Sequence, residues 1–248
     1  MNRLKEAWFE FKGIKSTDMG IRLRQMPTRF LPGRNTSRKN VAGRNGSVSY
    51  GASSDNDIQV RQECDALDET KFKELWYWLS GTGSLRFSDE PDLAYDASIE
   101  KEFVRAPIMP RGTGQRFTVI WICNPHRRQV PEADPIVITE SGTELLNPGT
   151  APALPRIEIV GSGDFSLNIG MQTLFFTDVD GGIIVDSELG DALTADGALL
   201  ANDCIDGDLF QIQPGLNTVS WLLGGADEDL DATGRIEKIT ITPRWRYR

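Results

Sequence analysis

His126 is the single histidine of the chain, so any site that needs an imidazole has to be built on it. It follows an apolar run in Cys123-Asn124-Pro125-His126, a setting typical of a turn, and the chain has no Gly-x-Ser-x-Gly motif. We therefore expect His126 to be a structural turn residue, not the base of a Ser-His-Asp or Cys-His site. Zinc and iron sites with several histidines are excluded by residue count.

Two glycine pairs and one acidic stretch begin like ligand-binding loops. After Gly81-Thr82-Gly83 and Gly161-Ser162-Gly163, the third glycine of a phosphate loop is replaced by Arg86 and Ser166, and no helical pattern follows. Asp178-Val179-Asp180-Gly181 opens like a calcium loop, but the residues after it break the EF-hand pattern. We expect a turn there, with a weak calcium site of another kind as the alternative. We assign no metal and no cofactor.

Acidic side chains are the remaining source of catalytic chemistry. The 36 Asp and Glu residues could supply the carboxylate pair of a glycoside hydrolase. No local motif marks any two of them, so a hydrolase stays an alternative without a named residue. We assign no catalytic residue and expect the chain not to be an enzyme.

The three cysteines are far apart in the sequence. An odd number without a Cys-x-x-Cys pair argues against a disulfide framework and against a zinc site. Cys64 and Cys123 each end an apolar strand pattern, where a thiol acts as a small hydrophobe. We expect these thiols to be buried and unreactive.

The net charge of −9 hides a contrast between two halves. Residues 1–130 carry 21 Lys and Arg against 16 Asp and Glu, a net of +5, whereas residues 131–248 carry 6 against 20, a net of −14. The first fifty residues alone hold 11 basic and 3 acidic side chains. The contrast favours two domains with different neighbours, or two independently solvated surfaces.

At 248 residues the chain is long enough for two domains or for one large β-domain. Residues 127–135 are the best candidate linker, so we expect domains at 1–130 and 131–248. The apolar runs are shorter than the roughly 20 residues of a membrane helix. The first residues lack the apolar core of a signal peptide, so we expect no membrane insertion and synthesis in the cytosol.

The first half predicts short strands around a Lys12-Gly13 turn, then strands near 58–64 and 83–87. The run 117–123 is continuously apolar, which predicts a strand buried on both faces. Residues 26–47 are rich in Pro, Gly, Asn and Arg, and therefore suit a long extended arm or loop better than a packed element.

One helix is expected, starting at Asp68 as its N-terminal cap and ending before Gly81 in a left-handed C-terminal cap. Leu67 would form a hydrophobic staple with the first apolar residue of the helix. Trp76 and Trp78 are two positions apart and so point about 200° apart around the axis. We expect Trp76 in the core and Trp78 as partial cover. The predicted apolar face is Phe72, Leu75, Trp76 and Leu79.

Beyond residue 135, strands recur at short spacing with turn signals between them and no convincing helix. This spacing predicts an all-β sandwich. The expected strands are 136–138, 156–160, 165–169, 173–176, 183–185, 218–223 and 236–242.

Several short phrases follow the order and spacing of one family. Together they resemble the distal tail proteins of siphoviruses, phages with long non-contractile tails. In the first half the phrases are Phe9–Ser16, Met19–Ile21, Val41–Gly46, Trp78–Ser88, Tyr95–Ala97 and Phe117–His126. In the second half they are Asn147–Ile159, Pro214–Trp221 and Ile239–Arg246. The departures are Arg127-Arg128, where an aromatic residue is common, and the acidity of the second domain.

The resemblance implies a mainly β fold in two domains. The first, at 1–130, is a mixed β-sandwich with one α-helix and an extended arm, and it forms a ring. The second, at 131–248, is a β-sandwich similar to galectins and carbohydrate-binding modules.

The resemblance also implies a place in the virion. Six copies form a homohexameric hub at the tail tip, assembled in the host cytoplasm, with a channel through which DNA passes. Its partners are the tail tube protein on one side and the tail-associated baseplate protein on the other. The second domains face a receptor-binding protein or a cell-surface glycan.

Two sets of surface residues follow as candidates. The basic arm would carry self-association, and its candidate residues are Arg29, Arg34, Arg38, Lys39 and Arg44. In the alternative of a carbohydrate-binding module, Trp221 and Trp245 would stack on a sugar, although both lie in strand patterns that favour a core. The basic stretch from Arg22 to Arg44 also suits nucleic acid, which the acidity of the whole chain disfavours.

Overall fold

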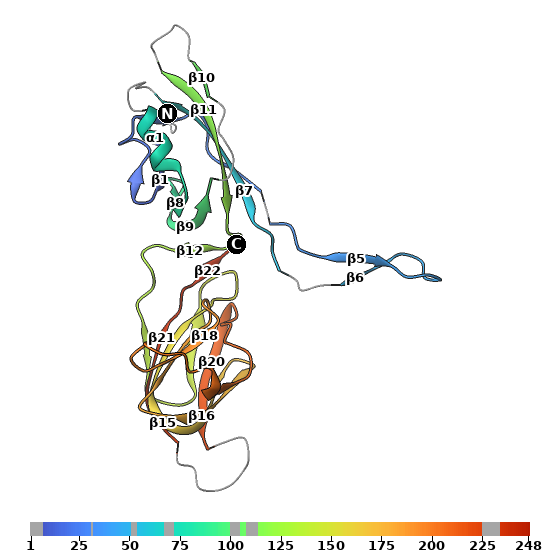
Figure 1. Ribbon diagram of the computed structural model, residues 1–248, viewed down its shortest axis with the longest axis vertical. Helices are drawn as coiled ribbons and strands as arrows, with labels where there is room; N and C mark the ends of the chain where they lie inside the picture. Colours follow the sequence, from blue (N-terminus) through green and yellow to red (C-terminus); the bar gives the residue numbers. More distant parts are fainter. Residues whose placement is uncertain are drawn as a thin grey trace. The chain divides into compact units, whose positions relative to one another are not determined.

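The computed structural model describes residues 7–30, 32–50, 54–66, 72–99, 105–107, 114–224 and 234–248. Their contacts divide the chain into two compact units, residues 1–130 and residues 131–248. The chain is mainly β, with a single α-helix among the described residues (Figure 1). The predicted fold class is confirmed.

The first unit is built on one sheet whose strand order is β2-β1-β8-β9-β11-β7-β3. In chain order these strands are β1 (Phe9–Phe11), β2 (Ile14–Lys15), β3 (Ile21–Leu23), β7 (Ile58–Ala66), β8 (Thr82–Phe87), β9 (Glu90–Ser98) and β11 (Gln115–Cys123). Three short strands join its sides: β4 (Thr28–Arg29) pairs with β7, β10 (Arg105–Pro107) with β11, and β12 (Arg127–Gln129) with β9.

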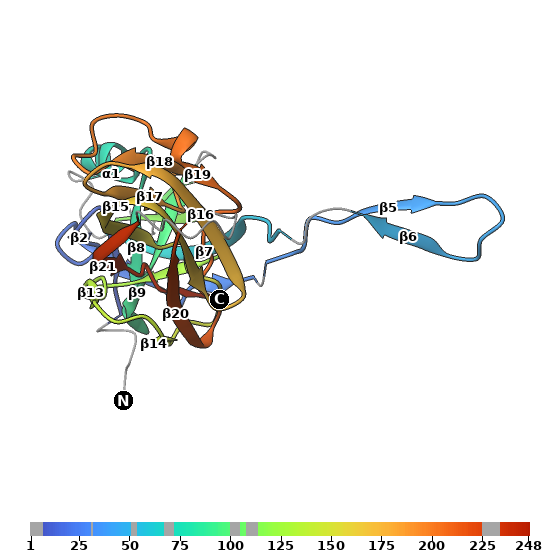
Figure 2. The same cartoon turned by 90° about the horizontal axis from the view of Figure 1, so that it is seen from below.

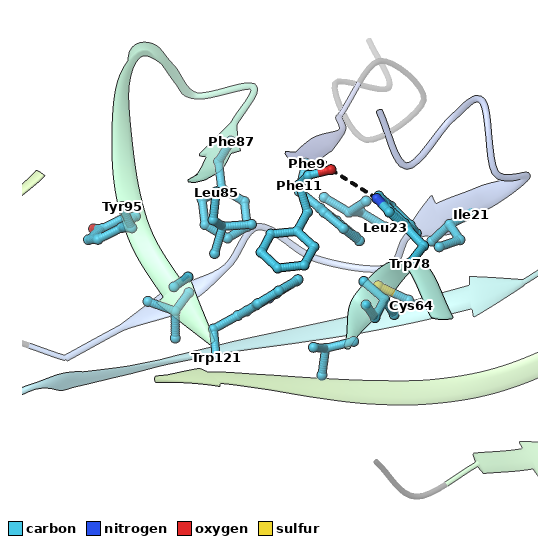
Figure 3. Close-up of a cluster of buried hydrophobic side chains, with 14 of the residues drawn as sticks. Phe9, Phe11, Ile21, Leu23, Cys64, Trp78, Leu85, Phe87, Tyr95 and Trp121 are labelled. Atoms are coloured by element: carbon cyan, nitrogen blue, oxygen red, sulfur yellow. Dashed lines mark hydrogen bonds between the residues drawn. The ribbon is translucent and has the colours of Figure 1, made fainter. Parts of the chain in front are cut away.

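The sheet curls around an aromatic core. Phe9 of β1 lies 5.7 Å from Trp121 of β11 between ring centroids, although β8 and β9 stand between these strands in the sheet order. Phe11 lies 4.8 Å from the same indole. Figure 3 shows these rings meeting with Leu85 and Trp78 in one cluster. Burial of such large rings supplies much of the driving force for folding this unit.

Alternation along β7 and β11 sets which side chains reach that core. Ile58, Val60, Gln62 and Cys64 of β7 are buried, and the residues that alternate with them are exposed or half-buried. On β11, Val119 and Trp121 are fully buried whereas Ile120 and Ile122 between them are half-buried. The prediction that this strand is buried on both faces was therefore wrong. Period-two alternation places the continuous apolar run with one face in the core and the other partly solvated.

The helix α1 (Phe72–Leu79) packs on the core through a different face from the one predicted. Leu75, Trp78 and Leu79 are buried, whereas Trp76 is 52% exposed. Trp78 stacks on Phe9 at 5.5 Å, and its Nε1–H donates to the Phe11 carbonyl over 2.8 Å. A buried indole needs such an acceptor, so the helix turns Trp78 inward and Trp76 outward.

Both ends of α1 were also predicted. The proposed cap Asp68, the staple residue Leu67 and the side chain of Phe72 lie outside the described residues. At the other end Gly81 has a φ of +74°, which confirms the left-handed C-terminal cap.

The Lys12-Gly13 turn is confirmed. Both residues have positive φ, 52° and 77°, and they join Phe11 to its cross-strand partner Ile14. Two left-handed residues in a two-residue loop make the hairpin turn that suits strand twist. Lys12 Nζ then reaches the Ser80 carbonyl at 2.5 Å and so ties this hairpin to the end of α1.

Part of the predicted linker at 127–135 belongs to the first unit. Arg128 pairs with Ala94 and Gln129 with Leu93 of β9. Side chains reinforce this pairing, because Arg128 Nη2 lies 2.8 Å from Asp96 and Arg127 Nη1 lies 2.6 Å from Glu90. The carboxylates of Glu90 and Asp96 on β9 thus pair with these two adjacent arginines and keep β12 beside β9.

The second unit has two sheets that share one long strand, β15 (Arg156–Ile169). The first half of β15 pairs with β17 and β21, and the second half pairs with β16 and β20. Outer strands complete the orders β13-β21-β15-β17-β18 and β14-β20-β15-β16-β19. Their bounds are β13 (Ile136–Ile138), β14 (Thr143–Asn147), β16 (Gln172–Val179), β17 (Ile183–Asp186), β18 (Asp191–Thr194), β19 (Ile205–Asp206), β20 (Gly215–Leu223) and β21 (Arg235–Thr242).

The predicted strands 156–160 and 165–169 are thus one strand that changes sheet. Register shifts fall at Val160/Gly161 and at Gly163/Phe165, where the strand bends. A Cβ on Gly161 would lie 2.3 Å from the Arg235 carbonyl oxygen, and Gly163 has a φ of +77°. The glycine pair that opens like a phosphate loop is therefore the corner of a sandwich.

Side chains from both sheets meet in the second core, where Phe165 stacks on Phe176 at 4.7 Å. Near the end of the chain, Arg244 donates from both Nη atoms to buried Asp186, over 2.6 and 2.9 Å. The Arg246 carbonyl in β22 (Arg246–Tyr247) accepts from Ala151 N–H over 3.1 Å. These contacts fix the last residues to the sandwich. The described residues of this unit contain one 3-10 helix, η2 (Asn202–Cys204).

Candidate assembly surface: the arm and its root

The predicted extended segment is the outer end of one long antiparallel ribbon. β3 pairs with residues 64–66 of β7, β4 pairs with residues 60 and 61, and an isolated bridge joins Arg34 to Asp55. Beyond the bridge, β5 (Ser37–Asn40) pairs with β6 (Ser47–Tyr50) as a separate two-stranded sheet. We call the described residues 32–50 and 54–57 the arm.

The arm has no core of its own. Every described residue in it is exposed or half-buried, and Figures 1 and 2 show β5 and β6 extending as a thin hairpin. Tyr50 is 51% exposed and Val41 is 42% exposed. A lone two-stranded ribbon is at best marginally stable in water, so this segment gains from a surface to lie against.

The arm also carries cations that no described residue neutralises. Arg34, Arg38, Lys39 and Arg44 form no ion pair with the part of the chain that the structure describes. Across the β5–β6 ladder, Arg38 faces Ser49 and Lys39 faces Val48. Some cations on the sheet are paired, as Arg86 is with Glu10 and Arg116 with Asp65. Among the described residues, the arm is therefore a basic and exposed surface.

Arg29 differs from the other four candidates for self-association. It lies in β4 at the root of the arm, and it donates to Asp89 from Nη1 over 2.6 Å and from Nη2 over 2.8 Å. Glu90 lies 3.5 Å from Nη2, and the guanidinium covers the Phe87 ring at 5.1 Å. Its charge is used within the unit, so its role in this structure is to fasten β4 to the β8–β9 turn.

The ionisation of this pair follows from its surroundings. Burial alone would raise the pKa of the Asp89 carboxyl, but the hydrogen bonds and charge of Arg29 outweigh it and lower that pKa. Burial alone would lower the pKa of Arg29, and the same partner raises it. Both groups are therefore charged across the neutral range, and their pairing is a permanent contact at the root.

His126 lies at this root as well. It stands in the bend between β11 and β12, as predicted, and its Nε2 lies 3.4 Å from Asp55 Oδ2. Asp55 is the residue that bridges Arg34. The turn that follows β11 therefore contacts the returning strand of the arm. Sequence inspection missed this pair and the Asp89–Glu90 contacts, because residues 60 to 71 positions apart share no local motif.

The two tryptophans proposed for a glycan are placed differently from each other. Trp245 is 5% exposed in the second core, between β21 and β22, and so is not within a strand. Trp221 is half-buried in β20 against the same core. Trp245 therefore lies in the core, as its sequence pattern favoured. Because its ring is covered, it cannot stack on a sugar in this structure, and its assignment as a glycan contact is corrected.

The other candidate sites have structural roles. Cys64 and Cys123 are fully buried, which raises the pKa of both thiols, that of Cys123 to about 12. Asp178, near the end of β16, and Gly181, in the turn between β16 and β17, both have positive φ. Within the described ranges no group of His, Cys, Asp and Glu could hold a metal ion. None of the helices described is long and apolar enough to cross a membrane.

Solved structures with a similar fold are known, and one of them matches almost the whole chain. No family model matches the sequence, and no curated protein matches it. The crystal structure of the Dit (gp 19.1) protein of phage SPP1 is similar with a TM-score of 0.70 and 17% identity. The match covers 96% of this chain and 98% of that one. That protein is described as a paradigm of the hub adsorption apparatus in phages that infect Gram-positive bacteria. The chain therefore has the fold of SPP1 Dit along almost its whole length.

Proposed function

We propose that this protein is a structural hub of a phage tail tip, without catalytic activity. Six copies form a ring between the tail tube protein and the tail-associated baseplate protein of the host-adsorption apparatus. The observation that carries this proposal is the likeness to the SPP1 hub protein, which spans both units of the chain. If the similarity to the SPP1 protein covered only one of the two units, it would support a shared domain but not a shared function.

The sequence phrases that resemble distal tail proteins support the same function. Phe9–Ser16 contains the β1–β2 hairpin, Trp78–Ser88 joins the end of α1 to β8, and Phe117–His126 is β11 with its turn. These elements supply the aromatic core and the root of the arm. The shared phrases thus specify the scaffold from which the arm extends.

The first unit, residues 1–130, is the ring-forming part in this proposal. Its arm is exposed, basic and without a core, and so suits a contact with a neighbouring copy. When the arm binds a different surface on that neighbour, the contact is head-to-tail, and head-to-tail contacts with rotation close into a ring. DNA would pass through the channel of that ring.

The second unit, residues 131–248, lies at the periphery in this proposal. It carries 6 basic and 20 acidic residues, and six such units held close together would repel one another. An outward position gives them the greatest spacing and leaves them free to contact a receptor-binding protein or a cell-surface glycan.

Light scattering after size exclusion, followed by negative-stain microscopy, tests the proposal on the full chain. We expect the mass of six chains and ring-shaped particles. A stack of two rings also agrees with the proposal. A protein that remains a single chain at tens of micromolar would overturn the proposed ring.

A further inference from the structure

We propose that Asn45, near the tip of the arm, is a site of spontaneous deamidation, which converts its neutral amide into a carboxylate. Asn45-Gly46 is the single Asn-Gly pair in the chain. The reaction needs no enzyme and no cofactor, because these two neighbouring residues supply both reacting groups and water completes it. The inference goes beyond the proposed function, since it concerns how the chain itself changes with time.

The loop between β5 and β6 leaves this pair outside the ladder of the hairpin. A turn closes the first part of the loop, where the Arg44 N–H donates to the Val41 carbonyl over 3.2 Å and Gly43 has a φ of +80°. Asn45 and Gly46 follow that turn and precede β6. Neither of them has a hydrogen-bond partner among the described residues. No contact therefore has to break before the two groups meet.

Gly46 leaves room for the reaction. Asn45 is exposed, and Figure 2 shows its loop at the far end of the thin hairpin. Gly46 has a φ of +84°, and a Cβ built on it would have no neighbour within 4 Å. Glycine has no side chain to shield its own nitrogen, and its backbone takes conformations that other residues avoid. The Gly46 nitrogen can therefore reach the Asn45 carboxamide by rotation of exposed bonds.

The reaction balances with water alone. The Gly46 nitrogen gives up its proton and bonds to Cγ of Asn45, while the Cγ–Nδ2 bond breaks and ammonia leaves with that proton. The product is a cyclic imide. Water then adds to one of the two carbonyl carbons of the ring. Addition at Cγ breaks its bond to the Gly46 nitrogen and gives aspartate. Addition at the main-chain carbon gives isoaspartate, in which the main chain runs through Cγ.

Either product changes the charge of the arm. Residues 32–50 hold four basic side chains and no acidic one, a net of +4. Deamidation places the first carboxylate in this stretch, directly after Arg44, and lowers its net charge by one unit. A smaller positive charge weakens the attraction of the arm for any anionic surface. The basic character of the arm thus declines with the age of the chain.

Asn40 is the matched comparison on the same arm. It is exposed like Asn45, but it lies in β5 opposite Ser47, and Val41 follows it. The branched side chain of valine crowds the attacking nitrogen, and the ladder holds the backbone extended. We therefore expect Asn40 to keep its amide.

Peptide mass spectrometry of the aged full-length chain tests the inference. At neutral and mildly alkaline pH, the peptide that contains Asn45 should gain about 1 Da, the difference between an amide and an acid. The gain should be faster at higher pH, because the attacking nitrogen must lose its proton. An isoaspartyl methyltransferase should label the aged chain. Asn45→Gln should lose both signals, since its longer side chain would need a larger ring, whereas Asn40→Gln should keep both.

The wild-type chain in urea gives the reference rate. The native chain should react within about tenfold of that rate, because an exposed loop opens at little cost. Reaction in urea alone, at every protein concentration, would overturn the inference, as would a gain at Asn40 as fast as at Asn45. A native chain that reacts when dilute but not at tens of micromolar supports the inference and shows that assembly covers the pair. A chain that deamidates but stays a monomer defeats the proposed function alone.

Discussion

Arg29 donates two parallel hydrogen bonds to Asp89, which stands 60 positions later in the chain. Arg29 belongs to β4, where the arm begins, and Asp89 belongs to the turn between β8 and β9. Both side chains are about three-quarters buried, at 25% and 29% exposure. The pair therefore connects β4, at the root of the arm, to the turn between β8 and β9, in a fork geometry that only arginine offers.

Replacing Arg29 by alanine should lower the free energy of unfolding by about 1–2 kcal/mol, because Asp89 loses its partner in a partly desolvated place. Urea unfolding of the full chain measures this. The matched control is Arg61→Ala, which removes a more exposed pair with Glu63 and should cost less than about 0.5 kcal/mol. Equal losses for the two variants would contradict the role given to Arg29.

The pair of Asp186 with Arg244 should make the second unit sensitive to acid. Burial alone would raise the pKa of Asp186, but the hydrogen bonds from Arg244 and from backbone N–H groups outweigh it and lower that pKa. A depressed folded pKa gives stability that is present above the unfolded value of about 3.9 and is lost as pH falls through the folded pKa.

Replacing Arg244 by alanine should therefore cost about 2 kcal/mol at pH 7 and much less near pH 2. Urea unfolding at a series of pH values gives the difference between variant and wild type. Arg235→Ala, at a pair whose arginine is 74% exposed, serves as control and should show a small difference at every pH. If the loss of unfolding free energy in Arg244→Ala stays constant down to pH 2, the ion pair with ionised Asp186 is not the source of that stability.

Thiol reactivity should separate the three cysteines. Cys64 and Cys123 are fully buried and their raised pKa values disfavour the thiolate, whereas Cys204 is half-buried. With an aromatic disulfide reagent, the native protein should release about one equivalent per chain quickly, and three after unfolding. Rapid reaction of all three in the native state would contradict the described core.

Separate expression of the two halves tests which of them assembles. Residues 1–130, which include β12, should form the ring, and residues 131–248 should be a monomer. Because the second half is strongly acidic, any association it shows should be weaker at low salt than at high salt. A monomeric first half together with an oligomeric second half would reverse the assignment.

The fold was predictable where one short segment decides its own structure. The Lys12-Gly13 turn depends on two adjacent residues, and the glycine at position 81 ends a helix by its own backbone freedom. Strands of the second unit follow from alternation and turn spacing, so most were located from sequence.

What failed depends on partners far away in the chain. Trp76 and Trp78 fit a helix equally well, and only Phe9 and the carbonyl of Phe11, from β1, decide that Trp78 is buried. The sequence pattern of β15 predicts two strands, because glycines at its bend interrupt the apolar alternation. The backbone nevertheless continues as one strand, and β21 pairs with it on both sides of the Val160/Gly161 register shift. The sequence indicated the basic arm of the candidate surface. It did not indicate that Arg29 pairs with Asp89, because the two residues are 60 positions apart.

The mass of the purified full-length protein in solution tests the central claim most directly. Light scattering after size exclusion at tens of micromolar should give six chains per particle, or twelve where two rings stack. The arm has no core, and its cations have no partner among the described residues. We therefore expect the purified protein to be assembled without any added partner. A mass of one chain across that range, at both low and high salt, would contradict the account.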